Sequence, residues 1–260
     1  MKHFKILSLT ALLCGVLLTH AQEREYPVPP RMTAAMTEIW TPQPAIVTPG
    51  NRMNVLIPAP SDAIVLFNGS SLDEWETIAG GEQRLPAAWE IKEGVLWTIP
   101  RTGALQTKRS FGDCQLHIEW MIPVGTQGES QGRGNSGVNI QGLYEIQILD
   151  SYNNETYING QAASIYKQYS PLVNAMNPQG VWNVYDIIYT APRFKENGTL
   201  HSPATMTVLH NGVLVQNNSI LLGGTVPVGI PSYRAHDNAP LQIFNTSVPI
   251  AFRNIWIREL

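Results

Sequence analysis

Glycine and proline interrupt this sequence so often that no long helix fits between them. Its 260 residues include 21 Gly and 19 Pro, and each proline fixes φ and removes a backbone hydrogen-bond donor. The segments between these residues are short, and many alternate apolar with polar side chains, as half-buried strands do. The sequence therefore predicts an all-β fold of about ten strands, which at this length is a two-sheet β-sandwich or jelly roll.

Turn signals locate the expected strands. Glu93-Gly94 and Asn211-Gly212 are pairs typical of two-residue hairpin turns. The stretch 153–178 is rich in turn residues, and we expect it to form a loop that covers a site. Strands are expected at residues 63–67, 89–92, 95–99, 115–120, 138–141, 143–149, 182–189, 205–210, 213–216 and 250–257.

Residues 1–21 have the pattern of a signal peptide. A short basic start precedes an apolar run over residues 6–18, and residues 19–21 offer small side chains for cleavage before Gln22. The apolar run is shorter than the roughly 20 residues that cross a membrane. We therefore expect an exported protein, periplasmic or secreted, without a membrane span.

The two cysteines bear on how the exported protein is anchored and on whether it forms a disulfide. Cys14 lies inside the apolar run and suggests a lipid-anchored surface protein as an alternative. This alternative is less favoured because Leu13 stands where a lipidation signal has Gly or Ala. Removal of the signal peptide would leave Cys114 as the remaining cysteine, so an internal disulfide is not expected. Cys114 is expected to be a small buried side chain.

The rest of the chain divides near residue 62. Residues 22–61 form a Pro-rich extended N-terminal segment, called the lead segment here, and residues 62–260 form the β-sandwich domain. Apolar residues such as Ile39 and Trp40 suggest that the lead segment packs along the domain. A formal net charge of −3 without a Lys/Arg cluster argues against nucleic acid as a partner.

Polar side chains alternate with apolar ones in the middle of the chain. Strand 115–120 places His117 and Glu119 on one side and its apolar residues on the other. Residues 138–149, read as one continuous strand, behave in the same way. The polar side of that second stretch carries Asn139, Gln141, Glu145 and Gln147.

Two interpretations of this polar face are open. The solvated face of any antiparallel sheet alternates in the same way. Amides and carboxylates beside aromatic rings are, however, typical of surfaces that bind sugars, because the polar groups bond hydroxyls while rings such as Tyr166 and Trp182 stack on C–H faces. An oligosaccharide or glycoside is therefore the expected ligand.

Six short motifs between about residues 62 and 260 point to a known family. They are Leu66-Phe67-Asn68-Gly69, Gly134-Asn135-Ser136-Gly137-Val138, Tyr144-Glu145-Ile146-Gln147-Ile148-Leu149-Asp150, Gly180-Val181-Trp182-Asn183-Val184-Tyr185-Asp186-Ile187, His210-Asn211-Gly212-Val213 and Phe252-Arg253-Asn254-Ile255-Trp256-Ile257. In this order they resemble the 3-keto-disaccharide hydrolase domain family. The resemblance implies a concanavalin A-like jelly roll, exported by many bacteria, that cleaves glycosides oxidised at C3.

This resemblance also implies roles for individual residues. A ketone at C3 acidifies the C2 proton, a carboxylate removes that proton, and loss of the C1 substituent followed by water addition gives net hydrolysis. We expect Glu145 to be this base, with Asn135 and Gln147 bonding the substrate or its developing enolate. Glu119 or His117 is the expected acid for the leaving oxygen.

The remaining expectations concern binding. No cofactor is expected; a divalent cation is conceivable, with Asp150 as a ligand, although no metal-ligand spacing is present. Two alternatives to the enzyme stay open, namely a catalytically silent, lectin-like carbohydrate-binding protein and a structural surface protein. Further substrate contacts are expected from Asn139, Gln141, Tyr166, Trp182, His236 and Phe244.

One segment departs from the family pattern. Family members usually carry Leu-Gln-Asp-His-Gly before the last motif, and an ungapped comparison aligns it with residues 243–247, so that Phe244 and Thr246 replace the glutamine and the histidine. Phe244 would suit an aromatic or less polar leaving group. We therefore expect activity to depend weakly on pH between about 6 and 8, unless His236 takes the place of the histidine.

Overall fold

The computed structural model describes residues 30–50, 56–80, 83–244 and 247–260. The predicted signal peptide, the first part of the lead segment and Thr246 lie outside the described residues. Within them the chain forms strands and three short 3-10 turns and no α-helix, and residues from Met32 onward belong to one compact unit. No helix in this described part has the length and apolar character needed to cross a membrane.

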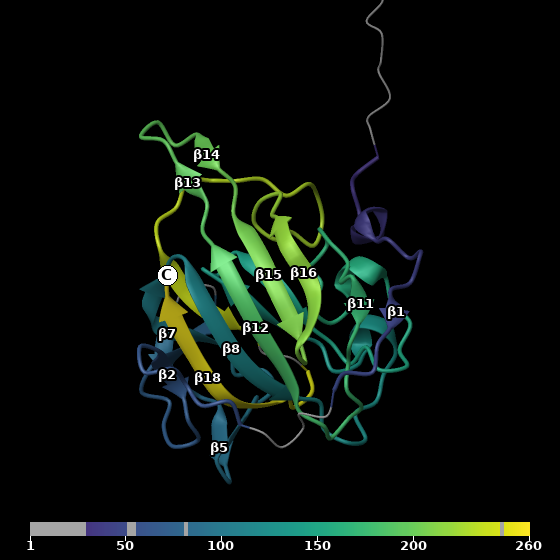
Figure 1. Ribbon diagram of the computed structural model, residues 1–260, viewed down its shortest axis with the longest axis vertical. Coiled ribbons are helices and arrows are strands. Elements are labelled where there is room, and N and C mark those ends of the chain that lie inside the picture. The colour runs from purple at the N-terminus through teal and green to yellow at the C-terminus, as the bar shows by residue number, and fades with distance from the viewer. Residues whose placement is uncertain (1–29, 51–55, 81–82, 245–246) are drawn as a thin grey trace, which may run out of the picture. The chain divides into compact units, whose positions relative to one another are not determined.

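Two antiparallel sheets form the sandwich, as predicted. In Figure 1 the strands β16, β15, β12, β8 and β18 of the larger sheet lie side by side. The six-stranded sheet has the order β10 (Tyr144–Ile148), β9 (Ser136–Ile140), β17 (Ala239–Ile243), β7 (Ala104–Phe111), β3 (Trp75–Ala79) and β4 (Gln83–Pro86). The eight-stranded sheet has the order β16 (Val213–Ile220), β15 (Thr205–His210), β12 (Asn183–Thr190), β8 (Cys114–Met121), β18 (Ala251–Glu259), β6 (Val95–Trp97) and β5 (Glu90–Lys92), with β2 (Ile64–Phe67) paired to β18.

The hydrophobic core fills the space between the two sheets. Alternate residues of β8 and β10, such as Ile118 and Ile146, are completely buried there. Burying an aliphatic side chain of this size stabilises the fold by about 1.5–3 kcal/mol. The Tyr185 hydroxyl of β12 crosses the core and donates to the Gln147 carbonyl oxygen at 2.8 Å. The polar residues that alternate with the core residues therefore lie on the two outer faces.

Residues 138–149 form two strands, as the expected ranges 138–141 and 143–149 have it, and not the single continuous strand assumed for the polar face. β9 and β10 are joined by the three residues 141–143, of which Gln141 and Gly142 have φ angles of 55° and 65°. Two successive positive φ angles reverse the chain in the sense that matches the twist of a hairpin. The turn brings Glu145 directly opposite Asn139. These two residues share a face as expected, but for the different reason that they are cross-strand partners.

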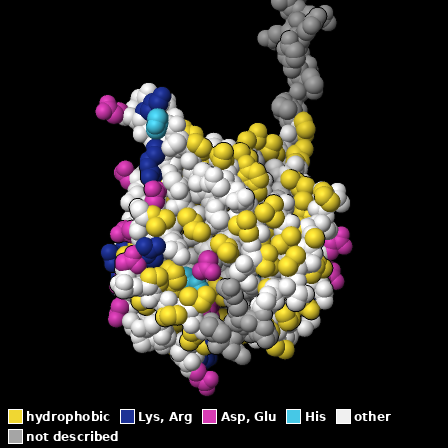
Figure 2. Space-filling model, in the orientation of Figure 1, with side chains coloured by type: hydrophobic (Ala, Val, Ile, Leu, Met, Phe, Trp, Pro, Cys, Tyr) yellow, Lys and Arg dark blue, Asp and Glu magenta, His cyan; other side chains and the backbone are white. Residues whose placement is uncertain are grey.

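The outer face of the eight-stranded sheet exposes several apolar side chains away from its centre. Ile188 of β12 and Leu214 and Ile220 of β16 are exposed there. Figure 2 shows the same face, with hydrophobic side chains spread over it and few charges. Charged groups gather instead on the hairpin of β13 (Arg193–Phe194) and β14 (Leu200–Ser202), which is at the upper left of Figure 1.

The lead segment is fixed to the loop that follows β10. Its strand β1 (Ala45–Ile46) pairs in parallel with β11 (Val173–Asn174). The Asn159 side chain accepts from the Ile39 N–H at 3.1 Å and donates to the Thr37 carbonyl oxygen at 2.9 Å. The expected packing of this segment along the domain is therefore present in its described part. The short 3-10 turns are η1 (Ala34–Thr37), η2 (Ser130–Gly132) and η3 (Ile158–Gly160).

Candidate functional site

Five polar side chains stand in one line across the outer face of the six-stranded sheet. Directly opposite residues of antiparallel strands share a face, and the register pairs these residues from strand to strand. We call this line the polar row. It consists of Glu145 on β10, Asn139 on β9, Gln242 on β17, Gln106 on β7 and Glu76 on β3.

Hydrogen bonds fill only one half of the polar row. Gln242 Nε2 donates to Gln106 Oε1 at 3.0 Å, and Gln106 Nε2 donates to Glu76 Oε1 at 2.7 Å. At the other half, Asn139 Nδ2 is buried and has no hydrogen-bond partner among the described residues. Buried polar groups are nearly always paired, so this amide is a donor that the described protein groups leave available to an ordered water or a ligand.

Glu145 is a buried carboxyl group without a counter-charge. The residue is 7% exposed, and among the described residues no cation pairs with its carboxylate. Burial alone raises its pKa to about 8 because a low-dielectric surrounding disfavours the charged form. Such a group changes protonation near neutral pH, which is the property a general base needs.

Two amide side chains border Glu145. With its amide nitrogen turned toward Glu145, Gln147 donates to Glu145 Oε1 at 3.1 Å and to the Ser136 carbonyl oxygen at 2.8 Å. The side chain of Asn135 lies 3.3 Å from the Gln147 amide and is partly exposed. The structure thus brings together three residues that the sequence assigns to one site, Glu145, Gln147 and Asn135.

Tyr166 joins this group through an additional stretch of pairing at the edge of the sheet. The backbone N–H of Tyr166 donates to the Glu145 carbonyl oxygen at 3.1 Å, and Ile165 forms an isolated bridge with Ile146. Ile146 and Ile165 are both completely buried on the core side. Because side chains alternate along extended chain, Tyr166 lies on the outer face beside Glu145.

His117, Glu119 and Trp182 are not part of this site. His117 and Glu119 lie on β8, on the outer face of the eight-stranded sheet, so the whole core separates them from Glu145. Trp182 belongs to the same distant face, where Arg253 stacks on its ring at 4.2 Å. The expectation that Glu119 or His117 would donate a proton to a substrate at Glu145 is therefore not compatible with their positions.

Instead, His117 and Glu119 form a buried ionic cluster, which we call the His117 cluster. His117 Nδ1 lies 2.6 Å from Asp186 Oδ1, and Glu119 Oε2 accepts from Arg253 Nε at 2.6 Å. Asn254 donates to Glu119 Oε1 at 2.8 Å and to the Ile57 carbonyl oxygen of the lead segment at 2.9 Å. Burial lowers the pKa of His117, but the bonds and charges of the two carboxylates outweigh it and raise the pKa overall. This cluster holds the lead segment on the sheet.

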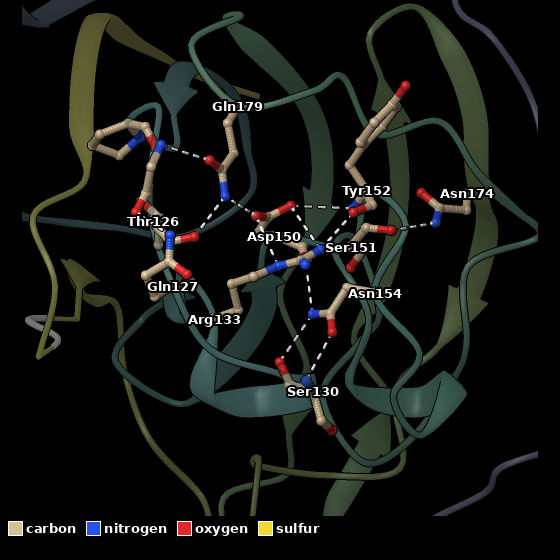
Figure 3. A network of polar contacts seen from close by, with 12 residues as sticks. Thr126, Gln127, Ser130, Arg133, Asp150, Ser151, Tyr152, Asn154, Asn174 and Gln179 are labelled. Carbon is tan, nitrogen blue, oxygen red and sulfur yellow. Dashed lines mark hydrogen bonds and ion pairs between the residues drawn. The ribbon is translucent and has the colours of Figure 1, made fainter.

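Asp150 is also occupied by protein groups. Figure 3 shows its carboxylate between Arg133 and Gln179. Its Oδ2 lies 2.9 Å from Arg133 Nε and 2.8 Å from Gln179 Nε2, and its Oδ1 accepts from the Tyr152 N–H at 3.2 Å. An arginine in contact with the carboxylate disfavours a cation there. Across the described part of the chain no group of three or more His, Cys, Asp or Glu side chains is placed to hold a metal ion.

Two further predicted residues lie away from Glu145. Gln141, in the hairpin turn, donates to the Phe111 carbonyl oxygen at 2.9 Å and accepts from the Tyr189 hydroxyl at 2.8 Å, so it is a structural residue. His236 Nε2 lies 2.8 Å from the hydroxyl of Tyr144, whose ring points into the core. His236 therefore cannot stand in for a histidine beside Phe244.

Phe244 does border the site. Its backbone N–H donates to the Gly137 carbonyl oxygen at 2.9 Å, and its side chain is 36% exposed. The preceding pair Leu241-Gln242 supplies the Leu-Gln of the family pattern two residues earlier than the ungapped comparison does. In this second alignment Gln242, which stands in the polar row, takes the place of the glutamine. Read from Leu241, the pattern puts Phe244 at the position of the histidine, which is replaced in either alignment.

Sequence reasoning missed three of the five residues of the polar row. Glu76, Gln106 and Gln242 lie on β3, β7 and β17, none of which is among the expected strands. The signal available for Gln242 was the Leu-Gln pair just before Phe244. Nothing local in the sequence marks Glu76 or Gln106, because their membership depends on the order of strands in the sheet.

Comparison with known proteins places the chain in a family. The chain is 49% identical to a Parabacteroides distasonis protein whose crystal structure is described as a "putative glycosyl hydrolase", with a TM-score of 0.75, over 88% of this chain and 97% of that one. Two other P. distasonis structures described in the same words are 17% and 20% identical, with TM-scores of 0.54 and 0.50, over 76% of this chain and 94% and 99% of theirs, and show a shared fold.

No curated protein matches the chain. A family model described as "3-keto-alpha-glucoside-1,2-lyase-like domain" matches residues 62–258, which include the polar row and its surroundings. The chain belongs to this family of 3-keto-alpha-glucoside-1,2-lyase-like domains.

Proposed function

We propose that this protein cleaves the glycosidic bond of glycosides that carry a ketone at C3 of the sugar, with Glu145 as the base. The observation that carries this proposal is the buried Glu145 carboxyl, which has no counter-charge among the described residues and whose pKa of about 8 suits proton transfer near neutral pH. Family membership and the likeness to proteins described as glycosyl hydrolases support a carbohydrate-active enzyme.

The proposed reaction needs one well-placed base. The C3 ketone makes the proton on C2 acidic, and the Glu145 carboxylate removes it. The electron pair of the C2–H bond then forms a C1–C2 double bond while the bond from C1 to the leaving oxygen breaks. Water adds to C1, and Glu145 returns its proton to C2, so that the sum is hydrolysis. Without the water step, the product is an unsaturated ketosugar.

Ordinary glycoside hydrolysis fits the polar row less well. That chemistry uses two carboxyl groups about 5–9.5 Å apart. The other carboxyl group of the row, Glu76, stands four strand spacings from Glu145, or about 19 Å at roughly 4.8 Å per spacing. A second carboxyl group could also come from Glu38 of the lead segment, but Glu38 is already paired with Lys167, at 3.4 Å. A single base acting next to a ketone therefore agrees better with this arrangement.

Neighbouring side chains supply the binding groups. Asn135 and Gln147 are the amides closest to Glu145, and they would bond the ketone oxygen or the enolate that develops on it. Asn139 Nδ2 adds an unused donor directly opposite Glu145, and a ligand must displace a neighbouring side chain to reach this buried atom. The exposed part of Phe244 offers an apolar surface that suits an aromatic leaving group.

The proposal is tested with Glu145→Gln on a 3-keto-glucoside. We expect loss of cleavage, and loss of exchange of the C2 proton of added 3-keto-glucose with D₂O, because the amide cannot accept that proton. The matched control is Glu196→Gln, which changes an exposed glutamate of the β13–β14 hairpin. A folded Glu145→Gln variant that retains the wild-type kcat removes Glu145 from the mechanism.

Carbohydrate binding without catalysis is the second candidate. The observation that favours it is Phe244 at the position where the family pattern has a histidine. Binding alone predicts that ordinary and 3-keto disaccharides raise Tm while neither is converted. Formation of product from the 3-keto sugar excludes this candidate.

We also propose that the protein is exported, on the basis of its first 21 residues. Mass analysis of the mature protein is expected to show an N-terminus at Gln22. A diacylglyceryl mass on Cys14 would instead prove a lipid anchor, and an intact Met1 would refute export by this signal.

A further inference from the structure

Two tyrosine hydroxyls meet beside Glu145. The hydroxyl oxygens of Tyr157 and Tyr166 are 2.8 Å apart. Burial and the nearby charge of Glu145 both raise the pKa of Tyr166, so this phenol keeps its proton at the pH where Glu145 has lost its own. A protonated donor and a deprotonated base thus stand side by side on the outer face of the sheet.

The direction of the hydrogen bond between the two tyrosines follows from their surroundings. Tyr157 is 6% exposed, and its hydroxyl has no partner other than Tyr166 among the described residues. A buried hydroxyl must donate its proton to the one acceptor available, so Tyr157 donates to the Tyr166 oxygen. Tyr166 is partly exposed, and its own proton is left free to point toward a bound substrate.

The Tyr157 ring is held in place from two sides. The Lys167 ammonium group lies 4.1 Å from the ring centroid, and Trp40 of the lead segment makes an edge contact with a centroid separation of 6.0 Å. Lys167 is itself held by Glu38 at 3.4 Å and by the Ala34 carbonyl oxygen at 3.0 Å. Two residues of the lead segment, Glu38 and Trp40, thereby fix the position of Tyr157.

We propose that Tyr166 is the acid that protonates the leaving oxygen, and that Tyr157 is a positioning residue that holds it. This inference rests on the proposed function and adds the proton donor that His117 and Glu119 cannot supply from the opposite face. The lead segment then completes the active site instead of merely covering it.

The proton balance closes over one turnover. When the bond from C1 breaks, the leaving oxygen takes its electron pair and receives the Tyr166 proton, which leaves a phenolate that accepts the Tyr157 hydrogen bond. In the second half, this phenolate takes a proton from the water that attacks C1, while Glu145 returns its proton to C2. Both residues end in their starting states, and no other reactant than water is needed.

The test compares leaving groups. The two substrates are the methyl and the para-nitrophenyl 3-keto-glucosides, and the variants are Tyr166→Phe, Tyr157→Phe and Tyr169→Phe. Tyr169 lies in the same loop, and its hydroxyl has no hydrogen bond to the described residues, so Tyr169→Phe is the matched control. Exchange of the C2 proton with D₂O in 3-keto-glucose measures the base step separately.

If Tyr166 is the acid, its removal should slow only the substrate whose leaving group needs a proton. In single-turnover reactions, Tyr166→Phe should lower the rate of leaving-group release from the methyl glycoside by about 100-fold or more but that from the para-nitrophenyl glycoside less than about threefold, because nitrophenolate leaves without a proton. C2 exchange should persist, Tyr157→Phe should show the same selectivity more weakly, and Tyr169→Phe should match wild type.

Other outcomes overturn the inference in distinguishable ways. Equal losses on both substrates, or no loss on either, refute the acid role of Tyr166 and leave Glu145 as the base. Loss of C2 exchange in Tyr166→Phe shows a structural effect and refutes it as well. A wild-type protein that neither exchanges nor cleaves refutes the proposed function, and the acid role with it.

Discussion

A Cβ atom at position 137 would lie 2.5 Å from Glu145 Oε1, closer than side chains approach one another. Gly137 is thus the residue that gives the Glu145 carboxyl group its place on the sheet. Its backbone does not have the left-handed conformation that glycine favours. The requirement for glycine here is one of space.

Gly137→Ala should therefore displace the Glu145 carboxyl group without changing its chemical nature. Because the clash is with the end of a flexible side chain, the fold accepts the methyl group and Glu145 moves aside. We expect kcat/KM to fall by about 100-fold, the effect of a displacement near 1 Å, with little change in Tm. Gly132→Ala, whose Cβ meets no atom within 4 Å, is the control. Full activity in Gly137→Ala would show that the position of Glu145 is not critical.

The pH dependence of activity follows from Glu145. Burial raises the pKa of this carboxyl to about 8, and only the ionised form accepts a proton. We expect kcat/KM on a 3-keto-glucoside to rise tenfold per pH unit between about pH 6 and 7.5 and to level off above pH 8. This replaces the weak dependence that the sequence suggests, which considered histidines alone. A flat profile from pH 6 to 8 would contradict the shifted pKa.

The raised pKa of Glu145 also means that its ionisation lowers the free energy of unfolding. The unfolded carboxyl ionises near its ordinary value of 4.5 and the folded one near 8, so the free energy of unfolding falls as pH rises between these values. Glu145→Gln should remove this loss and stabilise the protein at pH 8 by a few kcal/mol, at about 1.4 kcal/mol per pKa unit. Urea unfolding of the wild type and the variant at pH 5 and pH 8 measures this gain in stability. Equal gains at both pH values would point to packing instead.

The His117 cluster should affect stability and not chemistry. The folded pKa of His117 is raised above its ordinary 6.5, so its stabilising effect is complete below pH 6.5 and is lost as pH rises through the folded pKa. His117→Gln should therefore destabilise the protein more at pH 6 than at pH 9, as urea unfolding would show. Its kcat on a 3-keto-glucoside should equal that of wild type wherever it is folded. A selective loss of kcat would return His117 to the mechanism.

Asp150 should also act as a structural residue. Asp150→Asn leaves Arg133 without its partner in a site where Asp150 is 1% exposed, and breaking a buried ion pair in this way costs about 3 kcal/mol. A lower Tm is expected, and neither EDTA nor added Ca²⁺ should change the Tm of the wild-type protein. A Ca²⁺-dependent rise in Tm that Asp150→Asn abolishes would contradict this assignment.

The sequence predicts the sandwich because its alternation and turn signals are local. The hairpin at Asn211-Gly212 forms as expected between β15 and β16. β17 escaped prediction because it contains Pro240, which usually excludes a strand between two others. The structure accommodates this proline next to an irregularity in the pairing of β17 with β7, between Pro240 and Gln242.

The site was predicted in part for a related reason. Alternation shows that Glu119 and Glu145 both point away from the core, but it carries no information on which sheet each strand joins. Both residues satisfy the same pattern and end on opposite faces of the molecule. Likewise, Gln106 joins the polar row through pairing between strands distant in sequence, which no local pattern records.

The parallel pairing of β1 with β11 also fixes an order of events during synthesis. Ala45 leaves the ribosome well before Val173, its partner in the register, and domains assemble as the chain emerges. The lead segment must therefore wait, unpaired, until the loop after β10 has been made. Since β17 and β18, which lie inside the two sheets, follow Val173 in the chain, the loop that receives the lead segment is made before either sheet can be finished.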